Sequence, residues 1–265
     1  MAFKIAVDAG HYLGTAGKRC LKKLDANQTR EWVLNDRVAR HFMEAAKQYE
    51  GVELLRVDDV TGAKDVSLKN RCKAANNWGA DLYLSIHHNA GINGGSGGGI
   101  VAYSYKEKTT GAAYRDAIYD ACIAAGGLRG NRAEPIQAYG FYVLKHTDAP
   151  AVLMEYGFMD SKTDVPVILT DGYAKAMALA TMEAIAHKAN LTLKAPAAAM
   201  ELPVLRRGDK NEAVRAMQAL LTLRGFPCDT DGSFGPATQS QMKAFRGGSD
   251  ICDVAAWAAL LGVGA

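Results

Sequence analysis

Two short apolar runs that each end in a histidine constrain the fold of this chain more than any other feature. The first run leads into Asp8-Ala-Gly-His11, and the second is Leu82-Tyr-Leu-Ser-Ile86 followed by His87 and His88. Apolar runs of four to eight residues between turn formers are typical of buried strands. Because open α/β sheets bind ligands beyond the carboxyl ends of their strands, we expect these histidines at one rim of a sheet.

The region before residue 190 alternates between strand and helix patterns. We expect strands at 3–8, 52–57, 81–86, 99–104, 140–145 and 150–155, and helices at 29–49, 65–78, 109–125 and 171–189. This alternation predicts an α/β fold with a mostly parallel, twisted sheet and helices on both faces. The glycine-dense stretch 90–99 predicts an irregular, flexible loop at the rim of that sheet.

A run of small residues between Pro196 and Pro203 is typical of a linker. We therefore expect a first domain at 1–192, a linker at 193–203 and a second domain at 204–265. The second domain is small and all-α, and its three helices are expected at 210–224, 236–246 and 253–261. About 60 residues is near the lower size limit for a domain that folds alone.

Composition excludes several classes of protein. No run approaches the roughly 20 apolar residues of a membrane helix, so we expect no membrane insertion. A net charge of +3 gives no reason to expect a nucleic-acid partner. The five cysteines are odd in number and never closely paired, which predicts reduced thiols rather than a disulfide framework. The first residues lack the pattern of a secretory signal, so we expect synthesis in the cytoplasm without a signal peptide.

Four side chains are candidates for a catalytic centre. His11, His87 and Glu31 offer two imidazoles and one carboxylate, and a catalytic zinc ion takes three such ligands and keeps one position for water. Glu155 ends an apolar strand, where a carboxylate is either paired in a structural role or used as a general base. The spacing of these residues alone leaves a structural role for each of them open.

Two further histidines have open roles. Since side chains alternate along a strand, His88 is expected to point away from His87. It is therefore expected at most to contact residues that hold the site, not to bind a ligand itself. His146 lies just before the last predicted strand and is either a surface residue or a substrate contact.

The order of the motifs resembles the zinc-dependent N-acetylmuramoyl-L-alanine amidases of the type-3 family. The motifs are Asp8 to His11, Glu31 at the start of a helix, Leu55 to Asp58 at a strand end, Ser67 to Arg71, Ala75-Asn76, Ala80 to Ala90, and Pro150 to Phe158. The resemblance implies zinc ligands His11, Glu31 and His87, with Glu155 as catalytic acid and base. It implies hydrolysis of the amide bond between N-acetylmuramic acid and L-alanine of the stem peptide. The chain departs from the family at Tyr12, Leu55 and His88.

The tail resembles the peptidoglycan-binding type-1 domain, chiefly in Asp231-Gly-Ser-Phe234-Gly-Pro-Ala-Thr238. It departs from that family at Met217, Arg246 and Ala256. The resemblance implies a domain that anchors the chain to bacterial peptidoglycan.

Together these features predict a two-domain peptidoglycan hydrolase similar to a phage endolysin, which reaches the cell wall after release with a holin-type partner. Two alternatives stay open: a zinc peptidase that cleaves the stem peptide on the same scaffold, and a non-catalytic wall-binding protein. The presence of all four candidate residues argues against the second alternative. A bacterial autolysin, or export by another route, also stays open, and the sequence gives no prediction of the oligomeric state.

Overall fold

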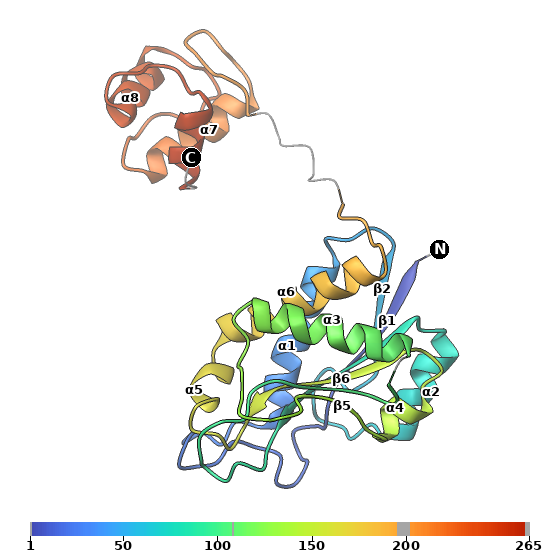
Figure 1. Ribbon diagram of the computed structural model, residues 1–265. Helices are drawn as coiled ribbons and strands as arrows, with labels where there is room; N and C mark the ends of the chain where they lie inside the picture. Colours follow the sequence, from blue (N-terminus) through green and yellow to red (C-terminus); the bar gives the residue numbers. More distant parts are fainter. Residues whose placement is uncertain (1, 108, 195–201, 263–265) are drawn as a thin grey trace. The chain divides into compact units, whose positions relative to one another are not determined.

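A computed structural model describes residues 2–107, 109–194 and 202–262 (Figure 1). The chain divides into two compact units, Met1–Lys194 and Ala195–Ala265. Most of the linker predicted at 193–203 lies outside the described residues. The two units are therefore described separately.

The first unit is built on a six-stranded sheet. Its strands are β1 (Phe3–Ala9), β2 (Val52–Arg56), β3 (Leu82–Asn89), β4 (Val101–Ser104), β5 (Ile136–Ala138) and β6 (Ala151–Phe158). The order across the sheet is β2-β1-β3-β6-β4-β5. Only the pairing of β4 with β6 is antiparallel. The mostly parallel sheet expected from the alternating pattern is thus confirmed.

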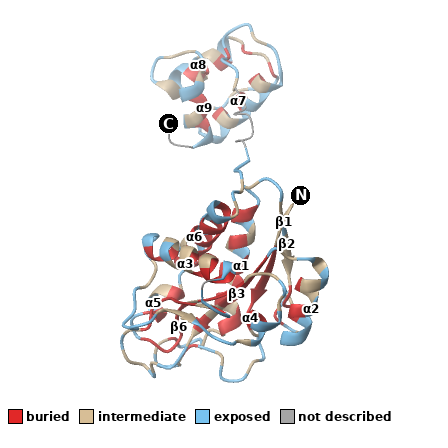
Figure 2. Ribbon diagram, turned by 45° about the vertical axis from the view of Figure 1, so that its right-hand side comes forward, coloured by how far each residue is buried: buried red, intermediate tan, exposed pale blue. Residues whose placement is uncertain are grey.

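Helices cover both faces of this sheet, as expected (Figure 2). One face packs against α1 (Glu31–Ala46), α3 (Thr110–Ala124) and α6 (Asp171–Lys188), and the other against α2 (Leu68–Trp78) and α4 (Tyr142–His146). A short helix, α5 (Val165–Ile168), follows β6. The inner strands β1, β3, β4 and β6 are mostly buried, which explains why their sequences are mainly apolar rather than alternating. The edge strands β2 and β5 are only partly buried.

The sequence supplies clear ends for the helix that flanks the site. Ser67 caps α2, because its side chain accepts a hydrogen bond from the amide of Asn70. Gly79 ends the same helix with φ of +70°, a conformation that glycine adopts without a Cβ clash.

The strand predicted at 140–145 is wrong. This segment forms the short helix α4, and the edge strand lies earlier at Ile136–Ala138. Val143 and Leu144 pack side by side onto the sheet, and the amide of Lys145 donates to the carbonyl of Phe141, as in a helical turn. A short apolar run is compatible with the periodicity of a helix and with that of a strand, so its pattern does not distinguish a strand from one turn of helix.

The glycine-rich stretch 90–99 is irregular, as expected, but carboxylates hold it at both ends. Asp160 Oδ2 accepts the consecutive amides of Gly91, Ile92 and Asn93 at 2.7–2.8 Å. Asp164 Oδ2 accepts the amide of Gly99 at 2.7 Å. The loop therefore has a defined path beside the end of β3.

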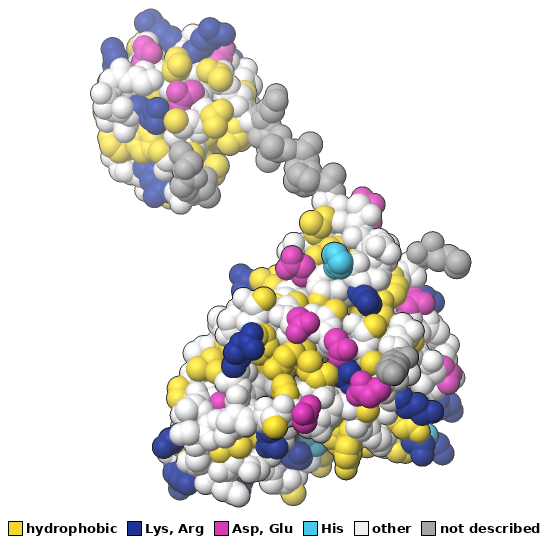
Figure 3. Space-filling model, in the orientation of Figure 1, with side chains coloured by type: hydrophobic (Ala, Val, Ile, Leu, Met, Phe, Trp, Pro, Cys, Tyr) yellow, Lys and Arg dark blue, Asp and Glu magenta, His cyan; other side chains and the backbone are white. Residues whose placement is uncertain are grey.

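The second unit contains α7 (Glu212–Leu223), α8 (Pro236–Arg246) and α9 (Val254–Leu261), in agreement with the expected three-helix fold. Its own apolar core includes Val214, Met217, Phe234, Met242 and Trp257. Among the described helices, none is long and apolar enough to cross a membrane. On the face drawn in Figure 3, basic and acidic side chains are interspersed, with no broad patch of one sign.

Candidate metal centre and active site

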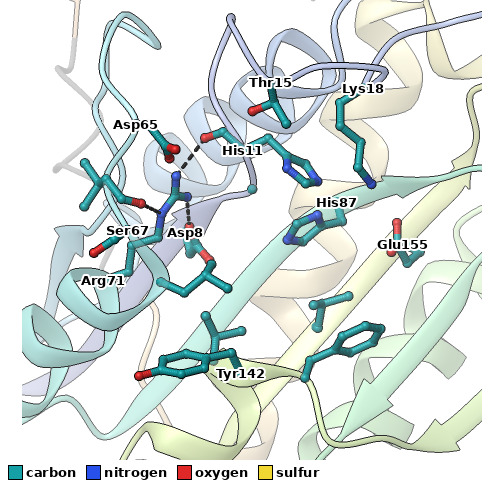
Figure 4. A pocket seen from close by; sticks show the side chains of 16 residues that line it. Asp8, His11, Thr15, Lys18, Asp65, Ser67, Arg71, His87, Tyr142 and Glu155 are labelled. Carbon is teal, nitrogen blue, oxygen red and sulfur yellow. Dashed lines mark hydrogen bonds and ion pairs between the residues drawn. The ribbon is translucent and has the colours of Figure 1, made fainter.

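The candidate residues meet at the carboxyl ends of three parallel strands. His11 follows β1, His87 belongs to β3 and Glu155 belongs to β6, where His87 and Glu155 are paired in register. Because side chains alternate along a strand, His87 and Glu155 face the same side of the sheet as Tyr83. Figure 4 shows His11, His87 and Glu155 around one cavity.

Glu31 completes the cluster from the start of α1. Its side chain is buried, with His87 Nδ1 at 3.0 Å from Oε1 and His11 Nε2 at 3.3 Å from Oε2. The three residues each offer one ligand atom, and these atoms all lie within 4.8 Å of one another. The structure therefore brings together three side chains that are up to 76 positions apart.

This geometry fits a zinc ion. Two ligands that each lie 2.0–2.1 Å from a tetrahedral ion are about 3.4 Å apart, close to the separation of His11 and Glu31. Glu31 Oε2 is buried and lies 3.3 Å from His11 Nε2 and 3.5 Å from Lys18 Nζ, without a well-formed hydrogen bond in the described chain. A cation bound between the three ligand atoms would satisfy this buried oxygen. Two imidazoles with one carboxylate are also a donor set that suits zinc.

The charges of Glu31, His11 and His87 stabilise one another. Burial would raise the pKa of Glu31, but the close contacts and positive charge of His11 and His87 hold that pKa well below its usual value. Burial would likewise lower the pKa of His87, and the neighbouring Glu31 carboxylate raises it instead. Glu31 is therefore the ionised member of the cluster, as a metal ligand must be.

Glu155 is in a different environment from Glu31. Burial, reinforced by the nearby charge of Glu31, raises the pKa of Glu155 to about 7, against the opposing effect of His87 and Lys18. Its Oε2 atom is buried and has no hydrogen-bond partner in the described chain. A carboxylate that takes and releases a proton near neutral pH suits general acid–base catalysis.

The backbone of His11 is held in an uncommon conformation. Its φ is +68°, which is unfavourable for a residue with a Cβ. Asn35 Nδ2 donates to the carbonyl of Gly10 at 3.0 Å, and Arg71 Nη2 donates to the carbonyl of His11 at 2.8 Å. Both peptide groups that flank the His11 Cα are thus fixed by buried side chains.

Arg71 is itself fixed by a buried ion pair with Asp8. Asp8 also accepts hydrogen bonds from Tyr83 Oη at 3.0 Å and Ser85 Oγ at 2.8 Å. Sequence reasoning placed Asp8 and Arg71 in family motifs but gave no role to either, nor to Asn35. Their role depends on contacts between residues more than 20 positions apart, for which spacing gives no signal.

His88 and His146, whose roles the sequence left open, lie outside the cavity. His88 points to the opposite side of the sheet, as expected, and its Nδ1 lies 2.8 Å from Asn35 Oδ1. It therefore supports the residue that holds the Gly10 carbonyl. His146 is exposed at the end of α4 and stacks on Tyr142 with ring centroids 4.0 Å apart. It is not among the residues that line the cavity.

The cavity has a volume of about 390 Å³, within the usual range for a small-ligand site. Besides the candidate catalytic residues, the polar side chains of Thr15, Asp65 and Ser67 line it, next to the apolar Val66 and Leu68. The facing wall is apolar and includes Phe141, Tyr142 and Leu153.

Comparison with known proteins agrees with this arrangement. The family described as N-acetylmuramoyl-L-alanine amidase matches residues 5–187, which include His11, Glu31, His87 and Glu155. The chain belongs to this amidase family.

Two relatives illustrate the amidase family. The chain is 33% identical over 181 residues to a sporulation-specific N-acetylmuramoyl-L-alanine amidase of Bacillus subtilis, a match that covers 66% of this chain and 64% of the relative. It is 31% identical over 196 residues to the N-acetylmuramoyl-L-alanine amidase CwlM of Bacillus licheniformis, covering 73% and 72% of the two chains.

Solved structures of amidases share the fold of the first unit. A Clostridium difficile N-acetylmuramoyl-L-alanine amidase aligns with a TM-score of 0.64 and 23% identity, covering 71% of this chain and 97% of that one. The catalytic domain of CwlV from Bacillus (Paenibacillus) polymyxa aligns with a TM-score of 0.63 and 21% identity, covering 72% and 100%. At these identities the likeness supports the fold.

Proposed function

We propose that this chain is a zinc-dependent N-acetylmuramoyl-L-alanine amidase of bacterial peptidoglycan. It hydrolyses the amide bond that joins the lactyl group of N-acetylmuramic acid to L-alanine of the stem peptide. The observation that carries the proposal is the convergence of His11, Glu31 and His87 beside the unpaired carboxylate of Glu155, within the segment that matches the amidase family.

Each residue has a defined part in this reaction. His11, Glu31 and His87 are the ligands, and a zinc ion held by them would lower the pKa of a bound water and polarise a carbonyl group. Glu155 accepts a proton from the attacking water and returns it to the nitrogen of the leaving L-alanine. The buried pair of Asp8 and Arg71 keeps the backbone of His11 in position throughout.

We assign wall binding to the second unit. The motif that resembles a peptidoglycan-binding domain is folded around Gln218, which donates to Asp231 Oδ1 and Thr238 Oγ1 and accepts the amide of Gly232. This network fixes the turn at Asp231-Gly232 on a unit with its own core. The support for wall binding is the motif and its ordered turn.

The endolysin-like role expected from the sequence is also part of the proposal. If the protein accumulates in the cytoplasm and needs a holin-type partner, cells that express it will lyse only after their inner membrane is permeabilised. Lysis on expression alone would contradict a holin-dependent release.

Mass spectrometry of fragments from purified peptidoglycan tests the reaction itself. An amidase releases stem peptides with a free L-alanine amino group and leaves glycan strands whose N-acetylmuramic acid residues carry free lactyl carboxylates. A stem-cleaving peptidase would leave L-alanine on the glycan, and a non-catalytic wall-binding protein would release nothing.

A further inference from the structure

A compact aromatic segment follows β5 and borders the candidate active site. Tyr139, Phe141 and Tyr142 fall within four residues, and the rings of Tyr139 and Phe141 lie 4.6 Å apart. Phe141 also packs edge-on against Tyr103 of β4 at 5.1 Å. Phe141 and Tyr142 line the same cavity as His87 and Glu155, and Figure 4 shows Tyr142 on one side of it.

The packing of α4 leaves Tyr142 available to a ligand. Val143 and Leu144 turn inward onto the sheet, whereas Tyr142 is 38% exposed. His146 stacks on the Tyr142 ring at an interplanar angle of 17°, which restricts the ring before any ligand arrives. A side chain that is already restricted loses little entropy on binding.

The phenylalanine and tyrosine rings of the cavity are found on one side only. Phe141 and Tyr142 line that side together with Leu153, whereas the polar groups of Asp65 and Ser67 lie across from Tyr142, next to the apolar Val66 and Leu68. A sugar ring matches this arrangement, because its faces present C–H groups that pack on aromatic rings and its edge presents hydroxyl groups that form hydrogen bonds.

A stem peptide matches the aromatic wall less well, since it carries free carboxylates that call for cations. The basic side chains of the cavity are Lys18 and Arg71. Lys18 Nζ lies 3.5 Å from Glu31, and Arg71 is paired with Asp8. Neither belongs to the aromatic segment.

We propose that the wall formed by Phe141 and Tyr142 is the subsite for a sugar ring of the glycan strand, next to the amide bond that is cleaved. The inference rests on the proposed amidase function and names the part of the substrate that this wall binds. Tyr142 is then a specificity-determining residue that distinguishes a glycan-linked amide from the same amide without sugar.

Two substrates separate this role from a general effect on the site. One is a disaccharide that carries the stem peptide, and the other is an N-lactoyl-L-alanyl peptide that lacks the sugar. Tyr142→Ala is expected to lower kcat/KM for the first about tenfold, mostly through KM, as the loss of one aromatic contact allows. Hydrolysis of the second is expected to stay unchanged.

Matched variants control for indirect effects. Tyr105→Ala removes a tyrosine that is also 38% exposed but does not line the cavity, and it should leave both substrates unaffected. Tyr142→Phe and Tyr142→Trp retain a ring and should restore hydrolysis of the disaccharide substrate. An equal loss on both substrates, or no loss with Tyr142→Ala, would overturn the proposal.

A binding measurement tests the sugar subsite independently of catalysis. Peptide-free glycan oligosaccharides added to the full chain should shift the amide NMR signals of residues 139–146, and Tyr142→Ala should abolish those shifts. Signals that move only in the second unit would overturn the subsite. If the wild-type chain hydrolyses neither substrate but the shifts at 139–146 occur, the amidase reaction fails while the sugar subsite stands.

Discussion

Asn35 fixes the peptide bond between Gly10 and His11, because its side-chain amide donates a hydrogen bond to the carbonyl of Gly10 at 3.0 Å. The contact joins α1 to the end of β1. Gly10 cannot be exchanged for a larger residue here, since a Cβ at that position would overlap the ring of His87. The positive φ of His11 is thus maintained by the residues packed around it.

Asn35→Ala is expected to weaken zinc binding by about 10- to 100-fold, the usual cost of losing a residue that orients a metal ligand. The physical reason is that the peptide before His11 loses its hydrogen bond and can leave the conformation that points the imidazole at Glu31. Competition with a chromophoric chelator measures the affinity. Asn77→Ala, at an exposed position of α2, is the control and should bind zinc like wild type. Equal affinity of Asn35→Ala and wild type would contradict this role.

His88 should make the stability of the first unit depend on pH. Burial lowers the pKa of His88 from 6.5 to about 3, so the folded state keeps this imidazole neutral while the unfolded state takes up a proton. The stabilising contribution is complete above pH 6.5 and is lost as the pH falls toward 3, by about 1.4 kcal/mol per pH unit.

Urea unfolding of metal-free protein between pH 5 and 6 measures this dependence. Wild type should lose more of its free energy of unfolding than His88→Gln, with slopes that differ by about 1.4 kcal/mol per pH unit. Parallel slopes would show that His88 is protonated in the folded state.

Glu155→Gln should reduce hydrolysis by about 10²- to 10⁴-fold, because glutamine cannot accept the proton of the attacking water. Zinc affinity should change little, since the three proposed ligands are intact. Release of free L-alanine amino groups reports the activity. Glu53→Gln, an exposed position of β2, is the matched control. Wild-type turnover by the Glu155→Gln variant would contradict the role of Glu155 as general acid and base.

Removal of residues 195–265 should leave a folded enzyme that binds peptidoglycan less well. The expectation follows from the separate apolar cores of the two units. Hydrolysis of a soluble muramoyl-peptide should be unchanged, whereas sedimentation with purified cell walls should fall. Unchanged sedimentation would assign wall binding to the first unit.

The strands that position the site could be predicted from the sequence alone. β1, β3 and β6 each contain a mainly apolar run, and their carboxyl ends carry or lead into His11, His87 and Glu155. Alternation along a strand was also enough to place His88 on the other face. These features depend on local pattern, which the sequence displays directly.

Features that depend on tertiary contacts could not be predicted from the sequence. The segment at Tyr142–His146 is a helix because Val143 and Leu144 pack on the sheet together, which the four-residue apolar run 141–144 does not reveal by itself. The support of His11 by Asn35 and Arg71 likewise arises only when α1, α2 and β1 assemble.

Anomalous diffraction from crystals grown with zinc tests the central claim most directly. The account predicts one anomalous peak 2.0–2.2 Å from a nitrogen of His11, a nitrogen of His87 and a carboxylate oxygen of Glu31, with Glu155 beside it but not bound. A fully loaded crystal with the zinc peak elsewhere, or with any of the three side chains out of reach of the ion, would contradict it.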